Sequence, residues 1–156
     1  MCRERIVDRV PSAVSIGIGR LSQHRFALHK RGVDGSAKAD AFYTGDERDE
    51  IWGVVLQIDP QHKADLDRFE SVGVGYEAVM TTVQMSNGKT FDAWTYRALT
   101  IAIEKDLQPF CWYRRFILHG ARQHGLPADY ERFLAAFAAV TDPDPVRRRG
   151  NERILE

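Results

Sequence analysis

The dipeptide Asn87-Gly88 constrains the fold of this chain most strongly. It lies between two runs of β-forming residues, Tyr76–Met85 and Thr90–Ala98. Asn-Gly between such runs is the strongest short-range signal for a β-hairpin, because the tightest hairpin turns need positive φ at both central residues. With a two-residue turn, residue i pairs with residue 175 − i, so Tyr96 lies opposite Val79. Tyr76 then faces the other side of the hairpin, unless a bulge intervenes or Tyr76 precedes the strand.

The remaining segments alternate between helical and β-like patterns. Pro11 ends a short charged helix at residues 2–9, and Asp59-Pro60 caps a helix that ends near Glu70. The apolar run 51–58 predicts a strand covered on both faces. Further strands are expected at 13–21, 24–29 and 37–43, a turn-rich segment at 30–35, and helices from Pro109 and from Pro127. Strands, a helix, a hairpin and then helices predict an α+β fold.

Composition predicts one domain with its own core. The chain has 156 residues, of which 44% are hydrophobic and 28% charged. We expect a domain over residues 1–140 and a polar tail over 141–156, which contains Arg147-Arg148-Arg149. The 22 basic residues balance the 22 acidic residues, which argues against a dedicated nucleic-acid binder.

The location predicted from the sequence is the cytoplasm. No apolar run reaches the roughly 18 residues that a membrane span needs, and the charged start does not resemble a signal peptide. The two cysteines, Cys2 and Cys111, are too few for a disulfide framework. We therefore expect a cytoplasmic protein with no membrane partner.

One carboxylate has an unusual position. Glu70 lies four residues after Leu66 and so about 40° from it around the predicted helix, on the apolar side. A carboxyl group directed toward a core has a raised pKa unless it is paired, which suits general acid–base catalysis. Alternatively, Glu70 ends the helix and turns outward, or it pairs with Lys63.

Other familiar chemical signals are weak. His119 and His124 lie about 140° apart on a helix, so they cannot bind one metal ion from adjacent positions. Gly17-Ile18-Gly19 lacks the third glycine of a dinucleotide-binding loop. We expect neither a metal nor an organic cofactor. Tyr113, on the first turns of the Pro109 helix, is consistent either with packing or with ligand contact, as are Tyr76 and Tyr96.

An ordered set of segments resembles the γ-glutamylcyclotransferase (AIG2-like) family. The set spans roughly residues 1–135, and it includes Arg9-Val10-Pro11-Ser12-Ala13, Ile51-Trp52-Gly53-Val54-Val55, Leu66-Asp67-Arg68-Phe69-Glu70, Gly75-Tyr76, Trp94-Thr95-Tyr96, Tyr113 and His119-Gly120-Ala121-Arg122-Gln123-His124-Gly125-Leu126-Pro127-Ala128-Asp129-Tyr130.

The resemblance implies a small mixed β-barrel, closed or nearly closed, with helices packed around it. It places Glu70 at the family's catalytic glutamate and Tyr76, Tyr96 and Tyr113 at its substrate-pocket tyrosines. The implied reaction cyclises a γ-glutamyl amide to 5-oxoproline and releases an amine or amino acid, without a cofactor. Which γ-glutamyl compound is used, glutathione included, cannot be read from the sequence.

Two departures from the family pattern are visible. Ser71 follows the glutamate where the family usually has glycine. The family also begins with a strand and a Tyr-Gly-Ser-Asn loop that holds the substrate carboxylate, whereas Met1 aligns just after that asparagine. The sequence therefore starts either at an internal methionine of an ordinary enzyme or at a true start.

A true start favours other functions. In that case we expect a catalytically inactive binding or interaction protein on the same fold, with a homodimer as a possible assembly because an unpaired barrel edge favours self-association. A different transferase or amidohydrolase on this fold also stays open.

Overall fold

The computed structural model describes residues 2–156. Met1, which was aligned just after the asparagine of the family's N-terminal loop, lies outside the described residues. Within this range, a four-stranded sheet has the order β4-β1-β5-β6, and β2 and β3 form a two-stranded ribbon. Every strand pair recorded for this range is antiparallel. The strands are β1 (Val14–Ser22), β2 (His24–Arg31), β3 (Ala37–Tyr43), β4 (Glu50–Gln57), β5 (Tyr76–Met85) and β6 (Thr90–Ala98).

The sheet curls into a half-barrel. Strand β1 pairs with β4 along its length but meets β5 only at Gly19 and Arg20, so the two strands diverge from that point. Gly19 permits this contact, because a Cβ there would lie 2.5 Å from the Val83 side chain. The ribbon completes the curve, since β2 contacts β4 and β3 contacts β6.

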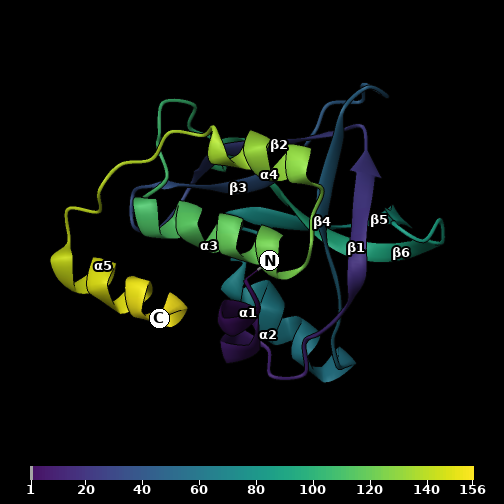
Figure 1. Ribbon diagram of the computed structural model, residues 1–156, viewed down its shortest axis with the longest axis horizontal. Coiled ribbons are helices and arrows are strands. Elements are labelled where there is room, and N and C mark those ends of the chain that lie inside the picture. The colour runs from purple at the N-terminus through teal and green to yellow at the C-terminus, as the bar shows by residue number, and fades with distance from the viewer. Residues whose placement is uncertain (1) are drawn as a thin grey trace.

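Helices cover the half-barrel on two sides (Figure 1). Helices α3 and α4 pack against each other on one side, whereas α1 and α2 lie together at one end. Helix α5, which lies near the C-terminus of the chain, contacts α3. The helices are α1 (Arg3–Arg9), α2 (Lys63–Phe69, preceded by a 3₁₀ turn over Pro60–His62), α3 (Cys111–Gln123), α4 (Ala128–Ala135) and α5 (Pro145–Glu152). Two further 3₁₀ turns span Thr100–Ala102 and Arg153–Leu155.

The α+β class and the barrel-like arrangement with flanking helices are confirmed. The predicted bounds of both hairpin strands and of β3 match the structure. Asp59 caps the 3₁₀ turn before α2, as predicted, by accepting a hydrogen bond from the backbone N–H of Gln61. Lys30 and Arg31, which were expected in a turn, instead extend β2.

The predicted register of the β5–β6 hairpin is wrong by one residue. Ala78, not Val79, lies opposite Tyr96. The turn contains three residues, 86–88: the Gly88 N–H donates to the Met85 carbonyl, and Gly88 alone among these three has a positive φ, +83°. This is a type I turn closed by a left-handed glycine. The shift places Tyr76 and Tyr96 on the same face of the hairpin.

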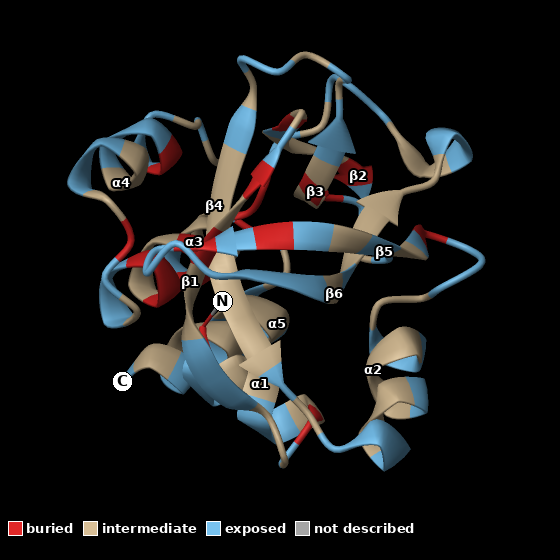
Figure 2. Ribbon diagram, turned by 90° about the vertical axis from the view of Figure 1, so that its right-hand side faces the viewer, coloured by how far each residue is buried: buried red, intermediate tan, exposed pale blue. Residues whose placement is uncertain are grey.

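One part of the core lies between the sheet and helices α3 and α4, which carry buried residues (Figure 2). Ile117, Ala121, Leu126 and Leu134 form one buried cluster, against which Trp52 and Val54 of β4 pack. The opposite face of β4 contacts a second cluster around Leu21, Val83 and Met85. Both faces of β4 are therefore covered, as predicted, but residues 51–56 are only half-buried.

Helix α2 ends in a Schellman motif. The Val72 N–H donates to the Asp67 carbonyl and the Ser71 N–H donates to the Arg68 carbonyl. Ser71 has φ +54°, in the left-handed region that glycine favours. The Ser71 carbonyl also accepts from the Gly75 N–H at 2.8 Å. The motif thus fixes the path of the chain between Glu70 and Tyr76.

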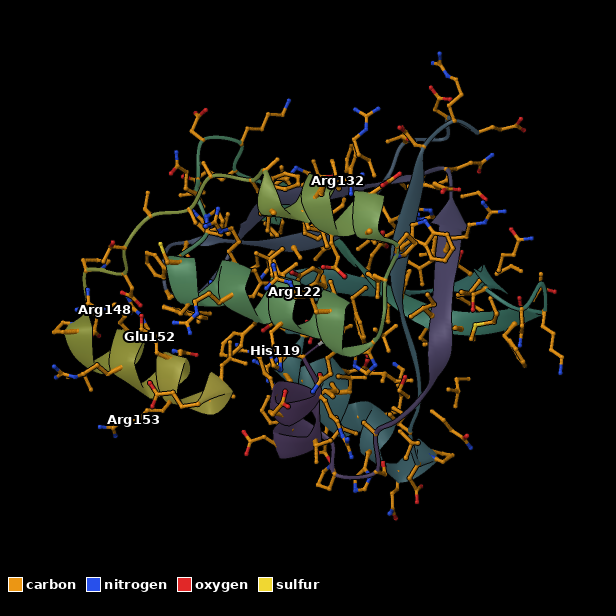
Figure 3. All side chains as sticks on the ribbon, viewed as in Figure 1. His119, Arg122, Arg132, Arg148, Glu152 and Arg153 are labelled. Atoms are coloured by element: carbon orange, nitrogen blue, oxygen red, sulfur yellow. The ribbon has the colours of Figure 1, made fainter. Side chains whose placement is uncertain are left out.

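The C-terminal segment 141–156, predicted to be a polar tail, contains a helix. This helix is α5, and Asp142 is fully buried. The Asp142 carboxylate accepts hydrogen bonds from the Trp112 indole at 2.8 Å and from Arg147 at 2.6 and 2.8 Å. Arg148 and Arg153 project outward (Figure 3). No helix within residues 2–156 has the length and apolar character needed to cross a membrane.

Replacement of Ser71 by glycine should stabilise the protein. A left-handed backbone costs an L-residue about 1–2 kcal/mol, and the greater freedom of glycine in the unfolded chain offsets about 0.4–1 kcal/mol of that gain. We expect Ser71→Gly to raise the free energy of unfolding by about 0.5–1 kcal/mol in urea titrations. Ser71→Ala should give no gain, and an equal gain from alanine would show that backbone strain is not the cause.

Loss of the Asp142 charge should destabilise the fold in a pH-dependent way. Hydrogen bonds from Arg147 hold the pKa of this carboxyl well below its usual range. We expect Asp142→Asn to cost about 2–4 kcal/mol at pH 7, because one of the two acceptor oxygens becomes an NH2 donor and the Arg147 guanidinium loses its counter-charge. The stabilisation is complete above the ordinary carboxyl pKa of about 4 and decreases at lower pH. Urea titrations at pH 7 and pH 3 should therefore show a smaller difference at pH 3, whereas exposed Asp106→Asn should have little effect at either pH.

Candidate active site

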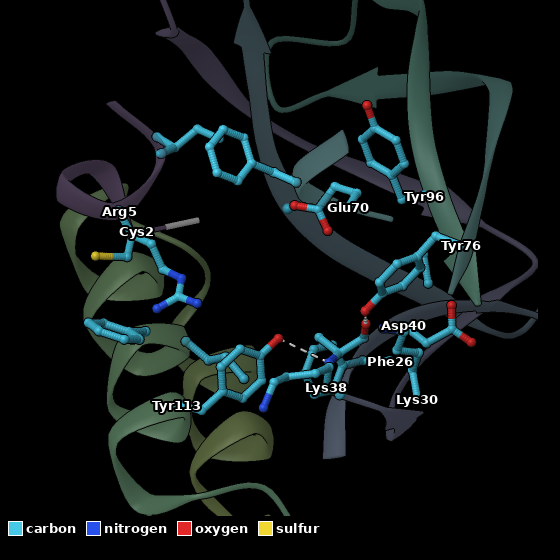
Figure 4. Close-up of a pocket in the computed structure, with 18 of the residues that line it drawn as sticks. Cys2, Arg5, Phe26, Lys30, Lys38, Asp40, Glu70, Tyr76, Tyr96 and Tyr113 are labelled. Atoms are coloured by element: carbon cyan, nitrogen blue, oxygen red, sulfur yellow. Dashed lines mark hydrogen bonds between the residues drawn. The ribbon is translucent and has the colours of Figure 1, made fainter. Parts of the chain in front are cut away.

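A cavity of about 530 Å³ opens inside the half-barrel. Helices α1 and α3, strands β2 to β6 and the end of α2 all contribute to its lining. This volume is typical of sites for small molecules. Figure 4 shows 18 of the lining residues, among which are all four that the sequence singles out: Glu70, Tyr76, Tyr96 and Tyr113.

Glu70 directs its carboxylate into this cavity (Figure 4). It is the C-terminal capping residue of α2, and its Oε1 lies 3.6 Å from the Arg9 guanidinium of α1. The two side chains are 27% and 25% exposed, so the pair is accessible to a ligand. Lys63, the alternative partner considered from the sequence, binds Asp67 at 2.6 Å instead. Glu70 is therefore neither turned outward nor paired with Lys63.

Tyr76 and Tyr113 bind the same backbone residue, Ala39 of β3. The Tyr76 hydroxyl donates to the Ala39 carbonyl at 2.6 Å, and the Tyr113 hydroxyl accepts from the Ala39 N–H at 3.0 Å. Burial raises the pKa of both phenols. Since Tyr113 acts as an acceptor toward Ala39, its own proton can be donated to a ligand, whereas the proton of Tyr76 is already used.

Tyr96 has a different role in the geometry. Its ring lines the cavity, but its hydroxyl donates to Asp67 Oδ1 of α2 at 2.7 Å. Burial raises its pKa, and the hydrogen bond to Asp67 acts in the same direction. The Lys63 ammonium donates to the same oxygen, Asp67 Oδ1, at 2.6 Å. Tyr96 thus connects β6 to the helix that ends at Glu70.

Cations in the cavity were missed at the sequence level. Arg5 and Arg9 lie one turn apart on α1, and Lys30 and Lys38 are directly opposite each other in the β2–β3 ribbon. Two lysines at directly opposed positions repel each other, so such a pair is unfavourable unless an anion lies nearby. The pair could therefore have indicated an anion site once the pairing of the two strands was known. The spacing of four residues between the two arginines could also have indicated one helix face.

The remaining candidates do not form a second site. No group of three or more His, Cys, Asp or Glu residues within 2–156 could hold a metal ion. His119 of α3 lies 3.5 Å from Glu4 of α1, outside the cavity lining. Cys2 and Cys111 are both free thiols.

Comparisons with known proteins identify the family of the chain. The sequence model of the AIG2-like family matches residues 50–134, just over half of the chain. The chain is 27% identical to γ-glutamylcyclotransferase of Bos taurus over 97% of its length and 79% of the relative. It is 30% identical to γ-glutamylcyclotransferase of Mus musculus over 85% of its length and 71% of the relative.

A solved structure shows the same fold. A γ-glutamyl cyclotransferase superposes with a TM-score of 0.85 at 24% identity, covering 98% of this chain and 91% of the other. The family model and the relative at 30% identity together assign the chain. The protein therefore belongs to the AIG2-like family of γ-glutamylcyclotransferase-like proteins.

Proposed function

We propose that this protein cyclises a γ-glutamyl amide to 5-oxoproline and releases an amine or an amino acid. The observation that carries the proposal is the Glu70 carboxylate, which faces a cavity of small-molecule size beside Arg9. Family membership supports a γ-glutamylcyclotransferase-like activity. No cofactor is required by the reaction, because the substrate carries both its nucleophile and its electrophile.

The substrate's α-amine is the nucleophile. It is mostly protonated at neutral pH, because an α-amine has a pKa of about 8. Glu70 accepts one ammonium proton, and the nitrogen lone pair then attacks the γ-carbonyl carbon. A new C–N bond closes the five-membered ring and the original amide C–N bond breaks.

The proton balance requires one group that both accepts protons from the attacking nitrogen and donates them to the departing nitrogen. Of the three ammonium protons, one stays on the lactam nitrogen and two reach the departing nitrogen, which leaves as an ammonium. Glu70 transfers these protons one at a time and ends in its starting form. The Arg9 guanidinium at 3.6 Å orients the carboxylate and complements its charge between transfers.

Two further features of the cavity assist this step. The Tyr113 hydroxyl, held by the Ala39 N–H, can donate its proton to the carbonyl oxygen as negative charge develops there. Confinement of the extended substrate in the cavity brings the amine toward the carbonyl, and well-aligned intramolecular reactions reach effective molarities of roughly 10⁵–10⁸ M.

Glu70→Gln tests the assignment of the general acid–base. Glutamine keeps the shape of the side chain but cannot accept the proton, so we expect 5-oxoproline formation from γ-glutamyl compounds to fall by at least about 10²-fold. The matched control is Asp65→Asn on the same helix, which removes a half-exposed carboxylate paired with Arg68. Undiminished turnover in Glu70→Gln would contradict the role. Wild-type protein that binds γ-glutamyl compounds without turnover would favour the binding-protein alternative.

Tyr113→Phe and Tyr76→Phe should separate the roles of the two phenols. Each variant leaves one polar group of Ala39 without its partner, so each should lower the free energy of unfolding by about 1–3 kcal/mol. Only Tyr113→Phe removes a free donor, and its kcat should fall by roughly 10²-fold while Tyr76→Phe retains most of its kcat. Equal losses of kcat would show that Tyr113 acts only through the position of β3.

A further inference from the structure

Lys30 is a buried cation without a counter-ion. The residue is 7% exposed and lines the cavity. Its ammonium lies 4.7 Å from the centre of the Tyr76 ring and packs so closely on Gly75 that a Cβ there would lie 2.7 Å from Nζ. Within residues 2–156 the ammonium makes no hydrogen bond and no ion pair within 4.0 Å.

An ammonium in such a position is unfavourable for the stability of the folded protein. A lysine with so little exposed surface is normally paired, because removing an unpaired charge from water is unfavourable. Burial lowers the pKa of Lys30, while the negative charges of Glu70 and Asp34 act in the opposite direction. The ring of Tyr76 offsets part of the cost through a cation–π contact. An anion that enters the cavity would supply the missing partner.

Arg5, which is half-buried, is a second cation without a carboxylate partner. Its guanidinium lies 4.9 Å from the Phe116 ring centre and 5.8 Å from that of Trp112, and it donates one hydrogen bond to Asn151. No carboxylate of residues 2–156 lies within 4.0 Å of it. In contrast, Lys38 is paired with Asp34 and Arg9 with Glu70.

The two unpaired cations lie on opposite sides of the cavity in the view of Figure 4, and Glu70 projects between them. The charge of Glu70 acts on the pKa of both. A γ-glutamyl compound always carries one carboxylate, on the carbon next to its α-amine. A second carboxylate is present only when the departing group is itself an acid. The cavity therefore has one cation more than a substrate with a neutral leaving group would use.

Building on the proposed function, we propose that Lys30 is a specificity-determining residue that binds a carboxylate on the leaving group. The Arg5 guanidinium then binds the carboxylate common to all γ-glutamyl compounds, for which its planar donor pair is suited. Lys30 acts as a point charge on the variable part of the substrate.

Matched substrates test this division. γ-Glutamylalanine and γ-glutamylethylamide differ only in the leaving-group carboxylate. We expect kcat/KM for 5-oxoproline formation to favour the alanine compound by roughly 10- to 100-fold, the range for a hydrogen bond to a charged group. Lys30→Met should remove this preference by lowering kcat/KM for the alanine compound alone. Arg5→Gln should lower both values by a similar factor.

Controls separate charge from folding. Arg31→Met removes a cation from the same strand, but Arg31 is exposed, lies outside the cavity lining and pairs with Glu104, so both kcat/KM values should be unchanged. Thermal melts should show that Lys30→Met is folded, since methionine suits a buried position. Calorimetric binding of both compounds to Glu70→Gln, with and without Lys30→Met, gives a readout that needs no turnover.

The outcomes distinguish this inference from the proposed function. If the wild type turns over both compounds and Lys30→Met changes both equally or neither, the role of Lys30 is overturned and the reaction stands. If the wild type turns over neither, but binding prefers the alanine compound only when Lys30 is present, the reaction is overturned and the role of Lys30 stands. If the wild type shows neither turnover nor binding of either compound, both the reaction and the role of Lys30 are overturned.

Discussion

The register of the β5–β6 hairpin determines what the inside of the half-barrel contains. With Ala78 opposite Tyr96, the rings of Tyr76 and Tyr96 lie on one face and both line the cavity. A slip of one residue would send one ring to the other side of the sheet. The turn that sets the register is itself bound to β1, because the Ser86 N–H donates to the Ile18 carbonyl at 3.1 Å. The turn that brings β5 against β1 therefore also determines where the two tyrosines lie.

Side chains, rather than a strand ladder, join β3 to β5, β6 and α3. Asp40 Oδ1 accepts from the Ala98 N–H of β6 at 2.7 Å, while its Oδ2 lies 2.8 Å from His29 Nε2 of the paired strand β2. The backbone of Ala39 is bound by Tyr76 and Tyr113. These bonds satisfy buried polar groups that a neighbouring strand would otherwise bind. Because the same tyrosines line the cavity, the closure of the half-barrel and the shape of the site cannot vary independently.

Local signals allowed most elements to be predicted, whereas contacts between residues distant in the sequence could not be. Asp59-Pro60 indicated the start of a helix from neighbouring residues alone, and Asp144-Pro145 carries the same signal at the start of α5, although the charged composition of that segment suggested a tail. The position of Glu70 on the apolar side of α2 followed from helical periodicity. In contrast, the ion pair of Glu70 with Arg9 joins residues 61 positions apart, and no periodicity encodes such a contact.

The cavity also explains why an overall charge of zero is uninformative about the ligand. Four cations, Arg5, Arg9, Lys30 and Lys38, line one small volume, and aromatic rings contact each of them. A ring face stabilises a cation without neutralising it, so the positive potential remains available to an anion. A carboxylate neighbour would instead cancel the charge, as Asp34 does for Lys38. Aromatic residues in this cavity thus stabilise cations that have no carboxylate partner and leave their charge available to a ligand.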